Sequence, residues 1–350
     1  ILLMACYTFS CFSIFTKEYV EDEKRVLIMQ NIVMFLMHFL AYMVMYLKMN
    51  EPKLMFFYVA QVVYFLAVIL LYSLIYPTVS KLIVNNMCML ISIGLIMITR
   101  LNYGSAVKQF IFAVLGSVFG LVVPVIIRKM KSLIDWTYIY AGVGLGALTL
   151  VAVFAATSGG AKLGFEIAGI GIQPSEFVKI GLIFFFSWFL QKNQEKINRP
   201  SVLVTAAVLA AVPLALILKQ PDLSTSIVIV FFILCLIYMA GISYKWIAGA
   251  LAVAVPSLAL VVWLAEHNMM PFLEPYQINR ILAFINPGKY AELNLQQDNS
   301  KMAIGSGRLY GKGLFNDTAI SVKNGNFLSE EHTDFIFSVI GEELGFIGCM

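Results

Sequence analysis

Long apolar runs recur along this chain and constrain its fold more than any other feature. Each run covers about 17 to 23 residues, enough for a helix to cross roughly 30 Å of hydrocarbon, whereas strands of a membrane barrel need about 10 alternating residues. The composition agrees, because 60% of the residues are hydrophobic, 13% are charged and the mean hydropathy is +0.86, which is too apolar for a soluble domain. The sequence therefore predicts an all-α polytopic membrane protein.

Charged or turn-rich breaks separate these runs and set the expected helices. An eleventh span begins near residue 335 and is still apolar at Met350, and the chain does not start with methionine, so we expect a fragment of a longer protein. The closely joined pair around Gln220 and Pro221 also fits short or re-entrant helices. The complete spans are expected near residues 1–16, 26–47, 54–76, 82–100, 106–127, 136–156, 174–190, 202–218, 223–241 and 244–265.

Basic residues in the short connections predict how the spans are oriented. Loops rich in Lys and Arg face the cytoplasm in most helical membrane proteins. Such residues gather at 128–131, at 192–199 and at Lys245. Counting spans from these loops places the segments 162–173, 220–222 and 266–334 on the outer side.

The segment 266–334 is long for a connection without structure, and such loops are usually functional or disordered. Its own apolar and turn patterns, MMPFLEPYQINRILAFINPGKY and MAIGSGRLYGKGL, indicate an ordered loop with short amphipathic helices at the membrane surface. Any chemistry is therefore expected to face outward.

Ionisable residues at the outer starts of spans are functional candidates, because charge is costly at membrane depth. Glu176 and Lys179 in IQPSEFVKI share one helix face, where they either form a local salt bridge or line a polar cleft. Asp222 in KQPDLSTS either caps its helix or joins that cleft. Lys108, at the outer start of another span, either snorkels to the headgroups or serves the site.

Cations in the long outer loop are candidate ligands for an anion. Arg280 in YQINRILAFINP either binds a phosphate or anchors the loop to anionic lipid. SKMAIGSGRLYGKGL is not a Walker motif, because Ser306 stands where that motif requires glycine and Gly313 where it requires Ser or Thr. What remains is a glycine-rich turn with cations that include Lys312, which is compatible with binding a diphosphate.

Asp334, in EEHTDFIFSVIGEELGFIG, stands directly before an apolar run. A single acid there would be typical of a helix N-terminus. Glu330–His332 before it and Glu342–Glu343 about two turns after it are more than a helix start requires. Asp334 is therefore either an acid at a helix N-terminus or a general base whose pKa this crowd and the helix N-terminus tune toward neutral pH.

Four motifs in this order resemble those of the SEDS family, the FtsW, RodA and SpoVE proteins of shape, elongation, division and sporulation. They are IQPSEFVKI, KQPDLSTSIVIV, YQINRILAFINP with NSKMAIGSGRLYGKG, and EEHTDFIFSVIGEELGFIG. The resemblance implies a SEDS-type transmembrane helix bundle over 79–350 that lacks its last core helices here. Residues 266–334 would be its large extracytoplasmic loop, and 1–78 would form additional N-terminal spanning helices.

The resemblance also implies an activity, partners and a site. SEDS proteins are peptidoglycan glycosyltransferases that polymerise lipid II into glycan strands at the outer face of the bacterial plasma membrane, together with a class B penicillin-binding protein. The family's essential aspartate falls on Asp334. Its polar cavity residues fall on Glu176, Lys179, Asp222 and Lys108.

The mechanistic hypothesis makes Asp334 the general base on the 4-hydroxyl of the acceptor GlcNAc, which attacks the anomeric carbon of the donor MurNAc. Cations would stabilise the departing undecaprenyl diphosphate, with Lys108, Lys179, Arg280 and Lys312 as candidates. A divalent cation, Mg²⁺ or Mn²⁺, is compatible with a diphosphate, but the sequence offers only scattered carboxylates and no histidine pair with metal-ligand spacing.

Two other hypotheses come from different classes of protein. The alternative is a lipid II flippase or other transporter, which would need its essential charges at mid-membrane, and Glu176 with Lys179 would suit such a path. A non-catalytic scaffold for a cell-wall synthase is the third.

Overall fold

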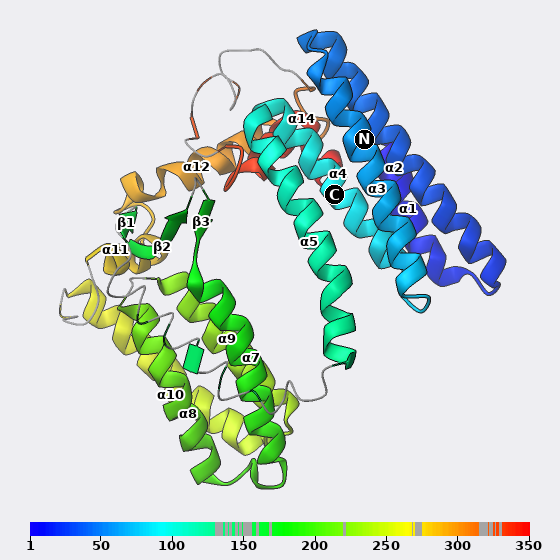
Figure 1. The fold of residues 1–350 in the computed structure, drawn as a ribbon. Helices are drawn as coiled ribbons and strands as arrows, with labels where there is room; N and C mark the ends of the chain where they lie inside the picture. The colour runs from blue at the N-terminus through cyan, green and yellow to red at the C-terminus, as the bar shows by residue number, and fades with distance from the viewer. Residues whose placement is uncertain are drawn as a thin grey trace. The chain divides into compact units, whose positions relative to one another are not determined.

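The computed structural model describes residues 1–129, 156–158, 161–167, 170–219, 222–267, 275–314 and 331–350, together with isolated residues between these ranges (Figure 1). The chain divides into two compact units. The first comprises Ile1–Ile126 with Asn294–Met350, and the second comprises Ile127–Leu293.

The first unit begins with a bundle of long apolar helices in which α2 contacts α1, α3 and α4 (Figure 1). Met34, Phe65 and Cys88 lie fully buried at its centre. Large apolar side chains such as Phe56 and Leu90 point outward, as expected where lipid surrounds a helix. The helices are α1 (Leu2–Ser13) with the 3₁₀ turn η1 (Ile14–Thr16), α2 (Val20–Met49), α3 (Lys53–Ile75), α4 (Lys81–Leu101) and α5 (Tyr103–Lys129).

Buried hydrogen bonds fix α2 against α4 inside this bundle. Such bonds hold membrane helices in register because lipid offers polar side chains no other partner. They join Asn85 to Gln30 at 3.1 Å, His38 to Ser92 at 2.8 Å and Tyr42 to Thr99 at 2.9 Å.

Two further helices complete the first unit, α12 (Ala291–Ser306, which belongs to it from Asn294 on) and α14 (Ile336–Cys349). Ala303 of α12 and Val339 of α14 pack with Leu328 against Met97 of α4. The helical geometry of α14 is interrupted at Gly345, where φ is 68° and ψ is −171°.

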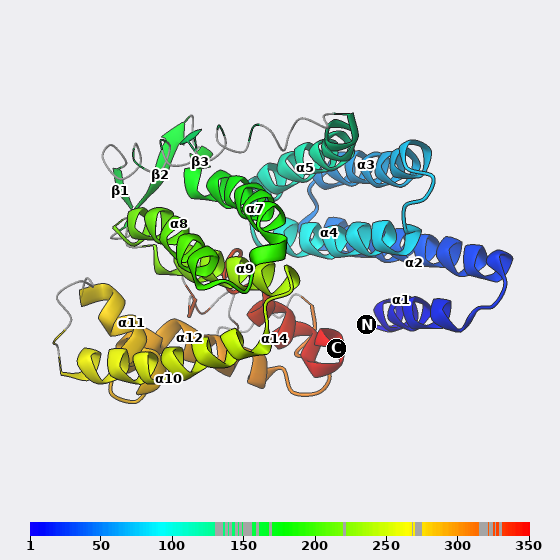
Figure 2. The same cartoon turned by 90° about the horizontal axis from the view of Figure 1, so that it is seen from below.

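The second unit opens with a small antiparallel sheet in the order β1-β2-β3, which leads into a group of helices (Figures 1 and 2). Phe186 of α7 and Ile217 and Ile229 of the next two helices form its buried core. The elements are β1 (Ala156–Ser158), β2 (Ala161–Ile167), β3 (Ile170–Ile172), α7 (Pro174–Lys192), η3 (Gln194–Lys196), α8 (Pro200–Leu218), α9 (Leu223–Met239), α10 (Tyr244–Glu266) and α11 (Pro275–Ile285).

The helical fold predicted from the apolar runs is confirmed. Each expected span that falls on described residues is a helix, with the largest difference at the start of α2, and the span expected over 136–156 falls largely outside the described residues. Among the described helices, α2, α3, α4, α5, α8 and α10 are long and apolar enough to cross a membrane. The protein is therefore a multi-pass membrane protein.

Two features of the outer segments extend the prediction. The expected short helices in 266–334 are present as α11 and α12, and α11 packs on α10 through Ile278, Leu282 and Ala265. The strands within 156–172 were not expected, because a glycine-rich stretch of this length gives no clear alternation.

Candidate functional site

Asp334 lies in the turn 331–335, directly before α14. Phe335 is the N-cap residue of α14, and no side chain caps this helix end. The Asp334 side chain is exposed, and no hydrogen bond or ion pair joins it to another residue in the described part of the chain. Helix capping therefore does not account for this aspartate.

Glu342 and Glu343 do not share the exposed position of Asp334, although the sequence suggested one crowd of acids. Both side chains are buried in α14, and each forms an ion pair. The Glu343 carboxylate forms a bidentate ion pair with the guanidinium of Arg100, which lies in the last turn of α4. Lys312 Nζ donates to Glu342 Oε1 at 2.6 Å. The two ion pairs join α14 to α4 and to Lys312. A buried carboxylate without such a partner would be strongly destabilising.

Arg100 was not among the residues predicted from the sequence. It has 4% of its surface exposed and stands in the last turn of an apolar helix, where an isolated arginine is unusual. The signal in the sequence that could have found this pair was the arginine in an apolar helix, together with the two acids of GEELG.

The glycine-rich turn 307–313 pairs with α14 through an exchange of backbone hydrogen bonds. The N–H groups of Phe346 and Ile347 donate to the carbonyls of Arg308 and Leu309, at 2.8 and 3.1 Å. The carbonyls of Glu342 and Glu343, which would normally accept those bonds within the helix, instead accept from Lys312 and Gly313 at 2.9 and 3.0 Å. We call this arrangement the glycine clasp.

The backbone of the clasp takes conformations that favour glycine, as at Gly311 and Gly345. Gly311 has a φ of 78° and Gly345 a φ of 68°, a region that side chains disfavour. A Cβ atom on Gly311 would also overlap the carbonyl oxygen of Glu343. The sequence suggested that this turn could bind a diphosphate. The backbone N–H groups of Lys312 and Gly313 are not available for that, because they donate to carbonyls of α14.

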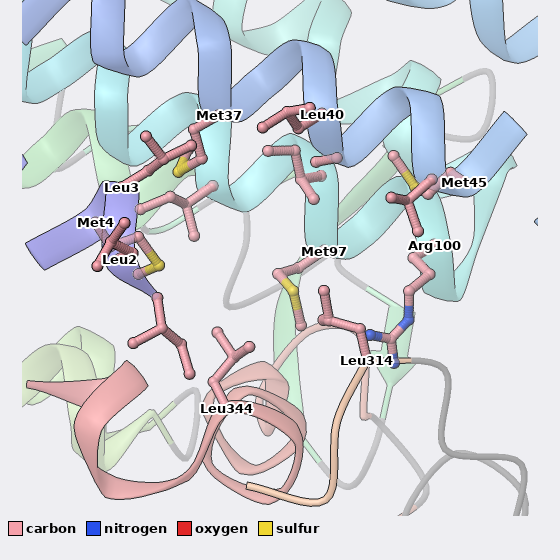
Figure 3. Close-up of a pocket in the computed structure, with 15 residues that line it drawn as sticks. Leu2, Leu3, Met4, Met37, Leu40, Met45, Met97, Arg100, Leu314 and Leu344 are labelled. Atoms are coloured by element: carbon pink, nitrogen blue, oxygen red, sulfur yellow. The ribbon is translucent and has the colours of Figure 1, made fainter. Parts of the chain in front are cut away.

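An apolar cavity of about 380 Å³ adjoins Arg100 (Figure 3). Leu2 and Met4 line one end, and Arg100 and Leu314 line the other, with Met97 between them. The lining is apolar apart from Arg100, so this cavity does not suit the recognition of sugar hydroxyls.

Lys108 lies in the second turn of α5 with an exposed side chain. No ion pair links it to a carboxylate in the described ranges. Its ammonium group is thus available to an anion in solution or at a membrane surface.

Asp222, in the second unit, is the N-cap of α9. Its Oδ1 accepts from the Thr225 N–H at 3.0 Å, and its Oδ2 accepts from Gln173 Nε2 at 3.0 Å. With 8% of its surface exposed and both oxygens bonded, this carboxylate ties the start of α7 to the start of α9. The capping interpretation is confirmed.

Glu176 and Lys179 form the expected local ion pair in the first turns of α7. Lys179 Nζ lies 2.7 Å from Glu176 Oε1, and the Glu176 side chain is 56% exposed. An exposed pair of this kind contributes at most about 1 kcal/mol.

Arg280 lies on the exposed side of α11, next to the buried residues that hold this helix on α10.

The structure thus brings some of the predicted residues together within each unit. In the first unit, Lys312 meets Glu342, and Asp334 precedes the same helix. In the second, Glu176 meets Lys179, while Asp222 meets Gln173 rather than either of them. Among the described residues, no group of three His, Cys, Asp or Glu side chains is arranged to hold a metal ion.

Comparison with known families gives a match over most of the chain. The model of the FtsW, RodA and SpoVE family, described as "Cell cycle protein", matches residues 72–350. Helices α1 and α2 and most of α3 precede this match. The boundary expected at residue 78 stays a prediction.

Curated relatives are similar over part of their length. The chain is 33% identical over 243 residues to a "Probable peptidoglycan glycosyltransferase FtsW" of Trichlorobacter lovleyi, covering 69% of this chain and 60% of the relative. It is 33% identical over 213 residues to the protein of the same name from Buchnera aphidicola subsp. Baizongia pistaciae, covering 59% and 51%. It is 31% identical over 239 residues to "Peptidoglycan glycosyltransferase MrdB" of Escherichia coli K12, covering 66% and 60%. The chain therefore spans 51 to 60% of the length of these relatives.

A solved structure has a similar fold. It comes from work described as "Structural coordination of polymerization and crosslinking by a peptidoglycan synthase complex". The TM-score is 0.55 at 22% sequence identity, over 81% of this chain and 71% of the other. This likeness supports the predicted helical bundle.

Proposed function

Because this chain belongs to the SEDS family of FtsW, RodA and SpoVE, we propose that it is a peptidoglycan glycosyltransferase that polymerises lipid II. The proposal concerns the whole protein, since the chain spans only part of the length of its relatives. The curated relatives carry the same activity in their names. Asp334 would be its catalytic base.

The exposed carboxylate of Asp334 is the observation that carries this proposal. A general base must reach the proton that it removes and must have a lone pair to accept it. Asp334 meets both conditions among the described residues, since it is exposed and has no partner there. Glu342, Glu343 and Asp222 are buried and bonded to other side chains, and Glu176 is paired with Lys179.

The chemistry proposed for Asp334 is a single displacement with inversion. Its carboxylate takes the proton of the GlcNAc 4-hydroxyl while that oxygen forms a bond to C1 of the donor MurNAc. The bond from C1 to the diphosphate oxygen breaks, and undecaprenyl diphosphate leaves with the electron pair. Each acceptor attack forms one glycosidic bond, and no covalent enzyme intermediate is required.

Stabilisation of the leaving diphosphate falls to the cations. Lys108 is the best placed of the four candidates, because its ammonium is exposed and no described carboxylate neutralises it. Lys312 and Lys179 each hold a carboxylate, so binding a diphosphate would require these ion pairs to open. Arg280, exposed on α11, is the fourth candidate.

The proposed orientation places Asp334 at the outer face of the bacterial plasma membrane. The basic loops at 128–131 and 192–199 support this, because such loops face the cytoplasm. A class B penicillin-binding protein is the proposed partner. The solved structure of similar fold supports it, since that structure is of a synthase complex that coordinates polymerisation with crosslinking.

The flippase alternative has less support from the positions of the charges. A translocation path needs essential charges at mid-membrane. Glu176 and Lys179 instead lie in the first turns of α7, and the Glu176 side chain is more than half exposed.

The proposal is tested with the full-length protein in detergent, with labelled lipid II, alone and with its cognate class B penicillin-binding protein. Asp334→Asn removes the base and keeps the side-chain volume. We expect glycan polymerisation to fall about 10² to 10⁴-fold. Asp298→Asn is the matched control, because Asp298 is an acid of the first unit with a half-exposed side chain, and its ion-pair partner among the described residues is Lys301.

Undiminished polymer from the Asp334→Asn protein would remove Asp334 as the base. If wild type made no polymer but scrambled lipid II in liposomes, the flippase alternative would take the place of the transferase.

A further inference from the structure

A second cavity, of about 230 Å³, opens between α2, α3 and α4 in the first unit. All three helices contribute residues from the same end of the bundle. Lys24 lies near the start of α2, Lys81 is the first residue of α4, and Ser73 lies in the last turn of α3. Because the apolar run of α2 begins just after Lys24, this end corresponds to the level of lipid headgroups.

The charged side chains that line this cavity are two lysines, Lys24 and Lys81. No carboxylate lines the cavity, and no ion pair joins Lys24 or Lys81 to a described acid. The first turn of α2 carries the acids Glu21, Asp22 and Glu23, none of which lines the cavity, and Asp22 pairs with Arg25 at 3.8 Å. The start of α4 adds to the field, since its N-cap Ser80 makes no side-chain hydrogen bond to the first N–H groups.

A buried acceptor stands beside the lysines. Asn31 lines the cavity, and its Oδ1 is buried without a hydrogen-bond partner in the described chain. A buried carbonyl oxygen without a donor is costly, so a ligand that brings a hydroxyl would gain this bond. Leu27 and Val84 supply an apolar wall next to these polar groups.

We propose that this cavity binds the headgroup of an anionic glycerophospholipid. The phosphate lies between Lys24 and Lys81, a headgroup hydroxyl donates to Asn31 Oδ1, and the glycerol and first methylenes contact Leu27 and Val84. Basic pockets between membrane helices are established sites for acidic headgroups. A zwitterionic ethanolamine headgroup fits less well, because no carboxylate lines the cavity to balance its ammonium.

This site does not depend on the proposed glycosyltransferase activity. Most of its residues belong to α2 and α3 and precede residue 72, where the family match begins. It gives these first helices a specific contact with the lipid of one leaflet.

The test uses the full-length protein in nanodiscs with spin-labelled phosphatidylglycerol, measured by electron paramagnetic resonance relative to phosphatidylcholine. We expect wild type to prefer phosphatidylglycerol, and each of Lys24→Gln and Lys81→Gln to lower that preference roughly five-fold. Lys48→Gln is the control, because it removes the same charge from the opposite end of α2. Asn31→Leu should weaken phosphatidylglycerol but not phosphatidic acid, which has no headgroup hydroxyl.

Three results would overturn the proposal. The first is an unchanged lipid preference in the Lys24→Gln/Lys81→Gln protein when it remains folded and monodisperse. The second is binding of phosphatidylethanolamine as tight as that of phosphatidylglycerol. The third is displacement of the labelled lipid by soluble glycerol phosphate, which would assign the cavity to a water-soluble phosphate compound.

Discussion

At the scale of single residues, the buried pair of Arg100 and Glu343 should be a large source of stability. Glu343→Gln leaves the guanidinium buried without its counter-charge, and we expect a loss of about 3 to 5 kcal/mol. Lys179→Met, which breaks the exposed pair with Glu176, should cost less than about 1 kcal/mol. Thermal unfolding of the purified protein in detergent measures both. Equal shifts would mean that the buried pair contributes no more than a surface contact.

A double variant separates charge from packing at the same place. Arg100→Met with Glu343→Leu removes both charges while filling their volume, and should recover most of the stability lost in Glu343→Gln. Asp334 could be selected as a candidate from the sequence alone, because Glu330, Glu331 and His332 stand directly before it in the chain. Arg100 could not, because its partner is 243 positions away and only the fold brings the two together.

At the scale of elements, the glycine clasp makes the turn 307–313 and helix α14 one structural unit. Gly311→Ala forces a left-handed backbone on a residue with Cβ and places that atom against the Glu343 carbonyl. We expect a loss of about 1 to 3 kcal/mol. Gly94→Ala in α4 is the control, because nothing lies near its Cβ position and alanine favours a helix. A smaller loss for Gly311→Ala than for Gly94→Ala would contradict the clasp.

The clasp also explains why this element was only partly predictable. The glycines and cations of 307–313 indicated a turn correctly, and the apolar run after 335 indicated a helix. Neither pattern indicates that N–H and carbonyl groups of the turn take the place of the hydrogen bonds that α14 would otherwise form within Glu342–Ile347. The sequence suggests that the N–H groups of this turn could bind an anion, whereas in the structure those of Lys312 and Gly313 donate to α14.

At the scale of the whole molecule, apolar length and basic loops predict the helices and their orientation. The helices agree because each must satisfy its own backbone in lipid, which makes spans a local property of the sequence. The strands of 156–172 and the interruption at Gly345 depend on pairing between segments and were not expected.

Orientation can be tested by labelling in intact cells. In a background without native cysteines, Asp298→Cys in α12 should react with a membrane-impermeant maleimide, and Asn198→Cys, before α8, should react only after permeabilisation. Both positions avoid the proposed catalytic and lipid sites. The reverse pattern would place Asp334 on the cytoplasmic side and exclude its use on an outer-face substrate.

The reciprocal backbone bonds of the clasp have a consequence for synthesis of the chain. The carbonyls of Arg308 and Leu309 accept from Phe346 and Ile347, which are made later. At roughly 5 to 20 residues per second, the turn waits on the order of seconds for its partners. During that interval water or the insertion machinery must satisfy the polar backbone of the turn, so the turn reaches its final hydrogen-bonded form only after α14 has been made.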